Sequence, residues 1–267
     1  MSILFVMTTV HRPRKRFGQH FLQDKSILDR MVEAIQPAQN DPMVEIGPGL
    51  GALTKRLLTQ VQHLDAVELD RDIIPLLIAA CHDLPGELSV HQGDVLAYDF
   101  RALTTLPASL RIVGNLPYNI STPLLFHLLE QSTVIKDMYF MLQKEVVDRI
   151  VAPPGGKEYG RLSIMVQCRC AVERLFIVGR DAFNPPPKVD SAVIKLVPYR
   201  TPPITITPIF TTIVREAFNH RRKTIRNSLR AFVTVAQLIE INIDPISRPE
   251  QLSMYDFEKI SRLFYDL

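Results

Sequence analysis

Four consecutive residues in the middle of the chain could form a pocket for an aromatic amine. Asn115, Leu116, Pro117 and Tyr118 follow a short apolar run. An amide oxygen and the neighbouring main-chain carbonyl can both accept hydrogen bonds from an exocyclic NH2 group, and a tyrosine ring can stack on a base. Accepting both N–H bonds localises the amine lone pair and directs it at an electrophile. Asparagine before X-Pro is also ordinary turn chemistry, so the interpretation depends on other parts of the chain.

A glycine-rich turn and two acidic residues indicate a cofactor that contains adenosine. The turn 47–51 reads Gly-Pro-Gly-Leu-Gly, and its side-chain-free positions let a ligand approach the backbone at a helix start. Glu68 ends the next expected strand, where a carboxylate can accept from both hydroxyls of a ribose. Asp94 ends the third and can accept from an adenine amine, although a turn or helix N-cap is its common alternative role. The G-x-G-x-G spacing departs from the dinucleotide fingerprint, which disfavours a pyrophosphate cofactor.

Alternating strands and helices are predicted to position these residues. Short apolar runs alternate with segments whose apolar residues recur every three or four positions, which favours a mostly parallel, doubly wound sheet with ligands at the carboxyl ends of its strands. Two later runs rich in β-branched residues are expected to add a hairpin at the sheet edge. The expected strands are 43–46, 63–69, 88–92, 110–114 and 138–142, and the expected hairpin strands are 172–178 and 192–197.

Composition divides the chain into a basic arm, a sheet domain and a small helical domain. Residues 1–16 lack an apolar period and carry four basic side chains, and residues 17–199 contain the expected sheet. Residues 200–267 begin with a proline-rich linker and continue with apolar residues at helical spacing. Residues 1–25 hold five basic residues against one acidic, and residues 200–267 hold ten against seven. A mildly acidic body between two basic ends indicates a polyanionic partner, which the net charge of +3 conceals.

A cluster of cations in the helical domain is predicted to contact RNA. Three arginines recur every fourth residue, and Arg215 and Asn219 extend the same spacing backward, so we expect one helix face that pairs with phosphates. A solvated helix face is the alternative. The cluster contains no acidic residue and consists of Arg221, Arg222, Lys223, Arg226 and Arg230.

Composition also excludes several classes of protein. With 46% hydrophobic and 22% charged residues, the chain is typical of a globular protein and not of a disordered, collagen-like or disulfide-stabilised one. Its apolar runs are too short to cross a bilayer, and no export signal is expected. The three cysteines match neither a disulfide framework nor a zinc spacing, so we expect no metal site and a reducing cytoplasm.

Four motifs, taken together, resemble those of the ribosomal RNA adenine dimethyltransferases of the KsgA type. The resemblance runs from about Arg14 to the end of the chain. It implies a Rossmann-like class I methyltransferase domain with a small all-α C-terminal domain, and S-adenosylmethionine as methyl donor. It also implies that two adjacent adenosines near the 3′ end of small-subunit ribosomal RNA become N6,N6-dimethyladenosine. The motifs are 17–22 (FGQHFL), 45–51 (EIGPGLG), 115–118 (NLPY) and 184–193 (NPPPKVDSAV), with 219–229 in support.

The same resemblance implies roles for individual residues. Asn115 faces both the sulfonium and the target amine, and Phe183 stacks on the face of the flipped base opposite Tyr118, with a core aromatic as its alternative role. Position 20 is asparagine in some members and histidine here, which affects any contact made through that side chain. The implied cofactor contacts are His20, Leu22, Gly47, Gly49, Glu68, Asp94 and Asn115, and the implied catalytic group is Asn115, Leu116, Pro117, Tyr118 and Phe183.

The expected protein is a cytoplasmic monomer that acts on a pre-assembled small ribosomal subunit without a membrane partner. Two alternatives remain at this point. One is a large-subunit ribosomal RNA adenine methyltransferase that confers antibiotic resistance, and the other is a non-catalytic RNA-binding factor of ribosome assembly. Segments 184–193 and 219–229 look more like the small-subunit enzyme, and the intact 115–118 segment favours retained catalysis.

Overall fold

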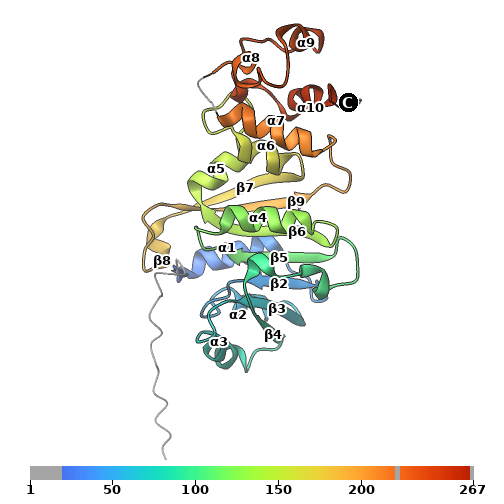
Figure 1. Cartoon of the computed structure of the whole chain (residues 1–267). Coiled ribbons are helices and arrows are strands. Elements are labelled where there is room, and N and C mark those ends of the chain that lie inside the picture. The colour runs from blue at the N-terminus through green and yellow to red at the C-terminus, as the bar shows by residue number, and fades with distance from the viewer. Residues whose placement is uncertain (1–19, 220–222, 265–267) are drawn as a thin grey trace, which may run out of the picture.

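A seven-stranded sheet forms the centre of the larger domain in the computed structural model, which describes residues 20–219 and 223–264 (Figure 1). The strand order is β4-β3-β2-β5-β6-β9-β7, and the first five of these strands are parallel. The hairpin strands β7 and β9 pair antiparallel at one edge, so both the parallel sheet and the edge hairpin are confirmed. The bounds are β2 Met43–Ile46, β3 His63–Glu68, β4 Glu87–Gln92, β5 Leu110–Asn115, β6 Ile135–Gln143, β7 Cys170–Val178 and β9 Ser191–Pro198.

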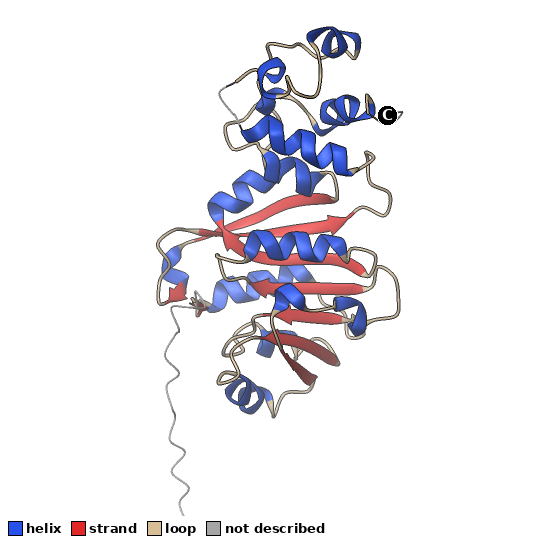
Figure 2. Ribbon diagram, viewed as in Figure 1, coloured by secondary structure: helices blue, strands red, loops and turns tan. Residues whose placement is uncertain are grey.

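Helices cover both faces of this sheet (Figure 2). Successive residues of β5 point to opposite faces: Ile112 enters an apolar core with α4 and α5, whereas Val113 enters a second core with α1, α2 and α3. No helix in the described parts of the chain is both long and apolar enough to cross a membrane. The helices are α1 Lys25–Ile35, α2 Thr54–Leu57, α3 Ile74–Cys81, α4 Ser121–Glu130, α5 Lys144–Val151 and α6 Arg161–Gln167, with single turns η2 Val95–Ala97, η3 Phe100–Leu103 and η4 Arg180–Ala182.

The C-terminal helices share a core with α6. Ile213 and Val214 of α7 pack in one buried cluster with Tyr159 and Met165, which precede the sequence-based boundary at residue 200. The helical part is therefore built onto the sheet domain rather than joined to it only by a linker. Its elements are α7 Pro208–Asn219, α8 Ile225–Ser228, α9 Val235–Glu240, η5 Pro249–Gln251 and α10 Met254–Arg262.

The expected continuous arginine face of the C-terminal part is wrong. The helix α7 ends at Asn219, and α8 begins at Ile225, so the spacing of four does not place the arginines on one helix. The N–H of Ile225 donates to the Ser247 carbonyl at 2.7 Å, and Ile225 is buried in the third core. Packing against this loop overrides the local helical period. Lys223, Arg226 and Arg230 are exposed, whereas Arg221, Arg222 and the basic arm at 1–16 lie outside the described residues.

A two-stranded sheet joins the first described residues to the segment before β9. Its strands are β1 (Phe21–Leu22) and β8 (Phe183–Asn184), which pair antiparallel. Two motifs more than 150 residues apart in the sequence thereby lie side by side.

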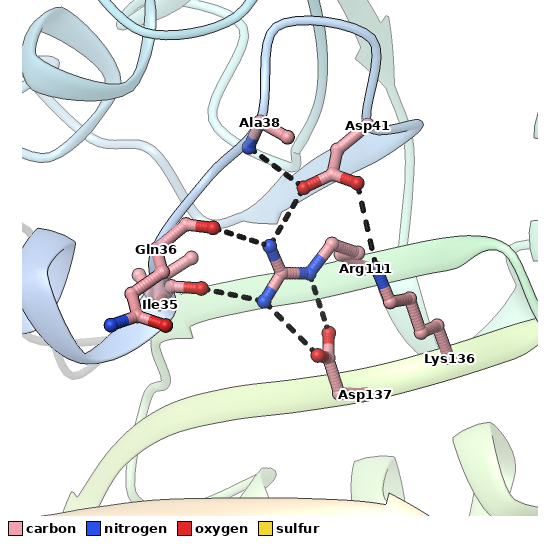
Figure 3. Close-up of polar contacts among 7 residues, drawn as sticks. All are labelled: Ile35, Gln36, Ala38, Asp41, Arg111, Lys136 and Asp137. Carbon is pink, nitrogen blue, oxygen red and sulfur yellow. Dashed lines mark hydrogen bonds and ion pairs between the residues drawn. The ribbon is translucent and has the colours of Figure 1, made fainter.

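A buried guanidinium holds the amino end of the parallel sheet to the end of α1 (Figure 3). Arg111, the second residue of β5, donates to the carboxylates of Asp137 and Asp41 and to the main-chain carbonyls of Ile35 and Gln36. These contacts account for all five of its N–H donors. Because this cluster lies at the ends of the strands opposite Asn115, it supports the sheet without taking part in the cavity described next.

Candidate active site

A cavity of about 670 Å³ lies at the carboxyl ends of four parallel strands. It follows β2, β3, β4 and β5, which is the edge where the sequence predicted ligand contacts. All but one of the predicted cofactor and catalytic residues line it: His20, Leu22, Gly47, Gly49, Glu68, Asp94, Asn115, Leu116, Pro117 and Tyr118.

The glycine turn forms one wall of the cavity, and its backbone conformation favours glycine at two positions. Gly47 and Gly49 have φ angles of 64° and 56°, in the left-handed region that glycine adopts at little cost. A Cβ on Gly49 would lie 3.0 Å from Phe21 Cε1, whereas a Cβ on Gly47 would meet open space. The turn therefore packs closely against β1 at Gly49 and leaves room for a ligand at Gly47.

Two buried carboxyl groups lie beside this wall. Glu68 accepts hydrogen bonds from the main-chain N–H of Asp70 at 2.8 Å and of Gly49 at 3.3 Å, and burial raises its pKa. Glu45 accepts from the Thr54 hydroxyl at 2.6 Å. The pKa of Glu45 is raised to about 7: burial raises it most, the Thr54 hydrogen bond lowers it, and the charge of Glu68 raises it.

Glu45 is a cavity residue for which the sequence predicted no role. Its side chain is 2% exposed and lines the cavity directly. The signal that could have identified it is a single acidic residue inside the buried strand Met43–Ile46, because an isolated buried carboxylate is costly unless it has a function or a partner. Buried carboxyl groups beside open space at Gly47 fit a nucleoside cofactor that carries a positive charge.

Asp94 caps a turn at the edge of the cavity. Its Oδ1 accepts from the Leu96 main-chain N–H at 2.9 Å, which caps the single turn η2. The residue also lines the cavity beside Gly93 and Val95. The hydrogen bond to Asp94 Oδ1 therefore stabilises η2, and Asp94 lies at the cavity wall just before it.

The orientation of the Asn115 amide is set from outside its own segment. Its Nδ2 donates to the main-chain carbonyl of His20 at 3.0 Å. Because the nitrogen is used in this way, Oδ1 is the end of the amide that remains to accept from a ligand. The next residue, Leu116, donates its main-chain N–H to the Met141 carbonyl at 3.1 Å, which holds the segment against β6.

The aromatic residues differ in their placement. Tyr118 lines the cavity, and its hydroxyl lies 2.7 Å from that of Ser191. Phe183 does not line the cavity: it is 3% exposed and lies in the second core with Leu22. The β1–β8 pairing places the Phe183 ring in the core, which is the alternative role considered for it, and its stacking on a base stays a prediction.

Comparisons with known proteins find similarity over nearly the whole chain. The family model described as ribosomal RNA adenine dimethylase matches residues 10–265. A protein of Pseudomonas savastanoi pv. phaseolicola named ribosomal RNA small subunit methyltransferase A is 53% identical over 253 residues, which cover 94% of each chain. The crystal structure of a dimethyladenosine transferase from Plasmodium falciparum aligns with a TM-score of 0.79 at 29% identity, over 92% of this chain and 98% of that one. The structure of 23S rRNA methyltransferase ErmE aligns with a TM-score of 0.70 at 23% identity, over 91% and 98%, which shows a shared fold alone.

Proposed function

Because this chain belongs to the ribosomal RNA adenine dimethylase family, we propose that it methylates N6 of two adjacent adenosines near the 3′ end of small-subunit ribosomal RNA. The methyl donor is S-adenosylmethionine, and the product is N6,N6-dimethyladenosine. The observation that carries this proposal is the Asn115 amide, which is oriented so that its oxygen remains to accept from a ligand in the cavity.

The chemistry follows from the placement of acceptors rather than from a strong base. S-adenosylmethionine supplies an electrophilic methyl group when bound. Asn115 Oδ1 and the Leu116 carbonyl accept the two amine hydrogens, and Tyr118 holds the plane of the base. The N6 proton becomes acidic once the nitrogen is alkylated, so positioning supplies most of the acceleration. The target base must leave its stack to reach the cavity.

The two alternative functions have weaker support. The large-subunit enzyme ErmE shares the fold at 23% identity, whereas the relative at 53% identity is named for the small subunit. A non-catalytic assembly factor would not need the acceptor geometry at Asn115. We further propose that the enzyme acts as a cytoplasmic monomer on a pre-assembled small subunit.

Labelled methyl transfer tests the function directly. The protein is incubated with labelled S-adenosylmethionine and either unmethylated small subunits or naked ribosomal RNA, and nucleosides are then analysed. We expect N6,N6-dimethyladenosine, with more product from the subunits. Cofactor binding without dimethyladenosine in either arm would instead support the binding-factor alternative.

Glu45 should make cofactor discrimination depend on pH. S-adenosylmethionine carries a sulfonium charge that S-adenosylhomocysteine lacks. The pKa of Glu45 is about 7, so its carboxylate is ionised above that pH and neutral below it. Coulomb attraction between unit charges about 4 Å apart is worth about 1 kcal/mol even in bulk water, or about fivefold in affinity. We expect the preference for S-adenosylmethionine to rise by about fivefold between about pH 6 and about pH 8, measured by calorimetry of both ligands.

The control for this prediction is Glu45→Gln, which keeps the shape and cannot ionise. Its preference between the two ligands should not change across the same pH range. A wild-type preference that is equally flat would contradict a charge role for Glu45.

Three exposed cations of the C-terminal part are expected to bind RNA. Replacing Lys223, Arg226 and Arg230 together by alanine should weaken RNA binding. The slope of log K against log salt concentration should become shallower by about 2, because fewer counterions are released. Filter binding over a salt series measures both quantities. The matched control is Lys259→Ala with Arg262→Ala, because those cations already pair with Asp256 and Glu258. An unchanged affinity and slope in the triple variant would rule out this contact.

A further inference from the structure

The ring of Tyr118 is held by two segments distant from it in the sequence. Its hydroxyl lies 2.7 Å from the hydroxyl of Ser191. The His20 ring stacks beside its own ring, with centroids 5.8 Å apart and planes 26° apart. The Ser191 hydroxyl holds the outer end of the ring, and the His20 ring lies against one of its faces.

Ser191 is a rigid anchor for this tether. It is the first residue of β9 and pairs with Gln143 of β6 and with Val178 of β7, so its backbone is held on both sides. Its side chain is fully buried. Movement of its hydroxyl would therefore require movement of the central sheet.

His20 is restrained by a hydrogen bond and by its position next to β1. Its Nδ1 lies 2.8 Å from the main-chain carbonyl of Pro185, and the next two residues pair with β8. The segment that contains Ser191 therefore positions Tyr118 both directly and through His20. Tyr118 itself is only half-buried and lies in a turn after β5, where an untethered ring could adopt several rotamers.

We propose that Ser191 is a positioning residue for methyl transfer, which fixes the Tyr118 ring in the orientation that stacks on the target adenine. This inference rests on the proposed function. Because the ring is ordered before the base arrives, base binding does not have to immobilise it. Ser191 does not line the cavity, so its effect should appear in RNA turnover and not in cofactor affinity.

A double-mutant cycle tests this role. With unmethylated small subunits, Ser191→Ala should lower kcat/KM by about fivefold, the change expected for one hydrogen bond, and Tyr118→Phe should lower it by a similar factor. The double variant should lose about fivefold as well, because each substitution removes the same bond. The Kd for S-adenosylmethionine should stay within about twofold of wild type in all three variants.

Two further variants separate positioning from folding. Ser261→Ala removes another fully buried serine hydroxyl, in α10 and outside the cavity, and should retain wild-type kcat/KM. Ser191→Cys keeps the side-chain shape with a weaker hydrogen-bonding group, and should lose activity while its melting temperature stays near wild type.

Three outcomes would overturn the proposal for Ser191. Multiplicative losses in the double variant, of about 25-fold, would mean that the two hydroxyls act independently. A parallel loss of cofactor affinity in Ser191→Ala would mean that the whole site had loosened. If the wild type is active and Ser191→Ala and Ser191→Cys retain full activity, the positioning role alone is refuted. If the wild type makes no dimethyladenosine, the proposed function is refuted and this role with it.

Discussion

Replacing Asn115 by alanine should lower methyl transfer by about a thousandfold while the cofactor still binds. The substitution removes the Oδ1 acceptor for the target amine, and loss of one such oriented electrostatic contact costs roughly a hundred- to a thousandfold in rate. It also frees the His20 carbonyl, which now accepts from Asn115 Nδ2 at 3.0 Å. Single-turnover methylation of small subunits measures the chemical step, and calorimetry with S-adenosylmethionine measures cofactor affinity.

A matched control for Asn115 is Asn40→Ala, in an exposed turn before β2 at the opposite end of the strands. That variant should methylate at the wild-type rate. A loss of less than about tenfold in Asn115→Ala would mean that the amide is not the main acceptor. A loss of cofactor affinity as large as the loss of rate would make Asn115 a cofactor ligand rather than the residue that binds the target amine.

The cavity could be predicted from the sequence because its residues follow parallel strands. The carboxyl ends of such strands meet at one edge, so the glycine turn, Glu68 and Asn115 converge whatever the details of packing. Local signals also mark both ends of α1: Asp24 accepts from two N–H groups at its start, and Pro37 follows its left-handed C-cap, Gln36.

The features that the sequence did not predict depend on contacts between distant segments. The bond from Asn115 to the His20 carbonyl joins residues 95 positions apart, and nothing local to either residue indicates it. Phe183 directly precedes a family motif, and its pairing with Leu22 places its ring in the core. The regular spacing of the arginines indicated one helix. In the structure a separate helix, α8, begins at Ile225, whose N–H donates to the Ser247 carbonyl.

Arg111 should contribute more to stability than any exposed ion pair of the protein. The guanidinium is 4% exposed, and its contacts with Asp137 and Asp41 span 2.7 to 3.0 Å (Figure 3). Burial alone would lower the pKa of Arg111, but the hydrogen bonds and charges of these two carboxylates raise it, so the group stays cationic. It also satisfies two carbonyls at the end of α1, which have no partner within the helix.

Arg111→Met removes the cation and leaves two largely buried carboxylates without it. Breaking a buried ion pair in this way costs about 3–5 kcal/mol, a large share of the 5–15 kcal/mol that typically holds a domain folded. For a domain of this size we expect the melting temperature to fall by roughly 10 °C in a calorimetric scan. Arg101→Met is the matched control, because Arg101 pairs with Asp99 on the surface, where solvent screens the pair and little stability depends on it. Equal shifts in the two variants would contradict the role of Arg111, because they would mean that the buried network between α1, β5 and β6 contributes no more than a solvent-exposed pair.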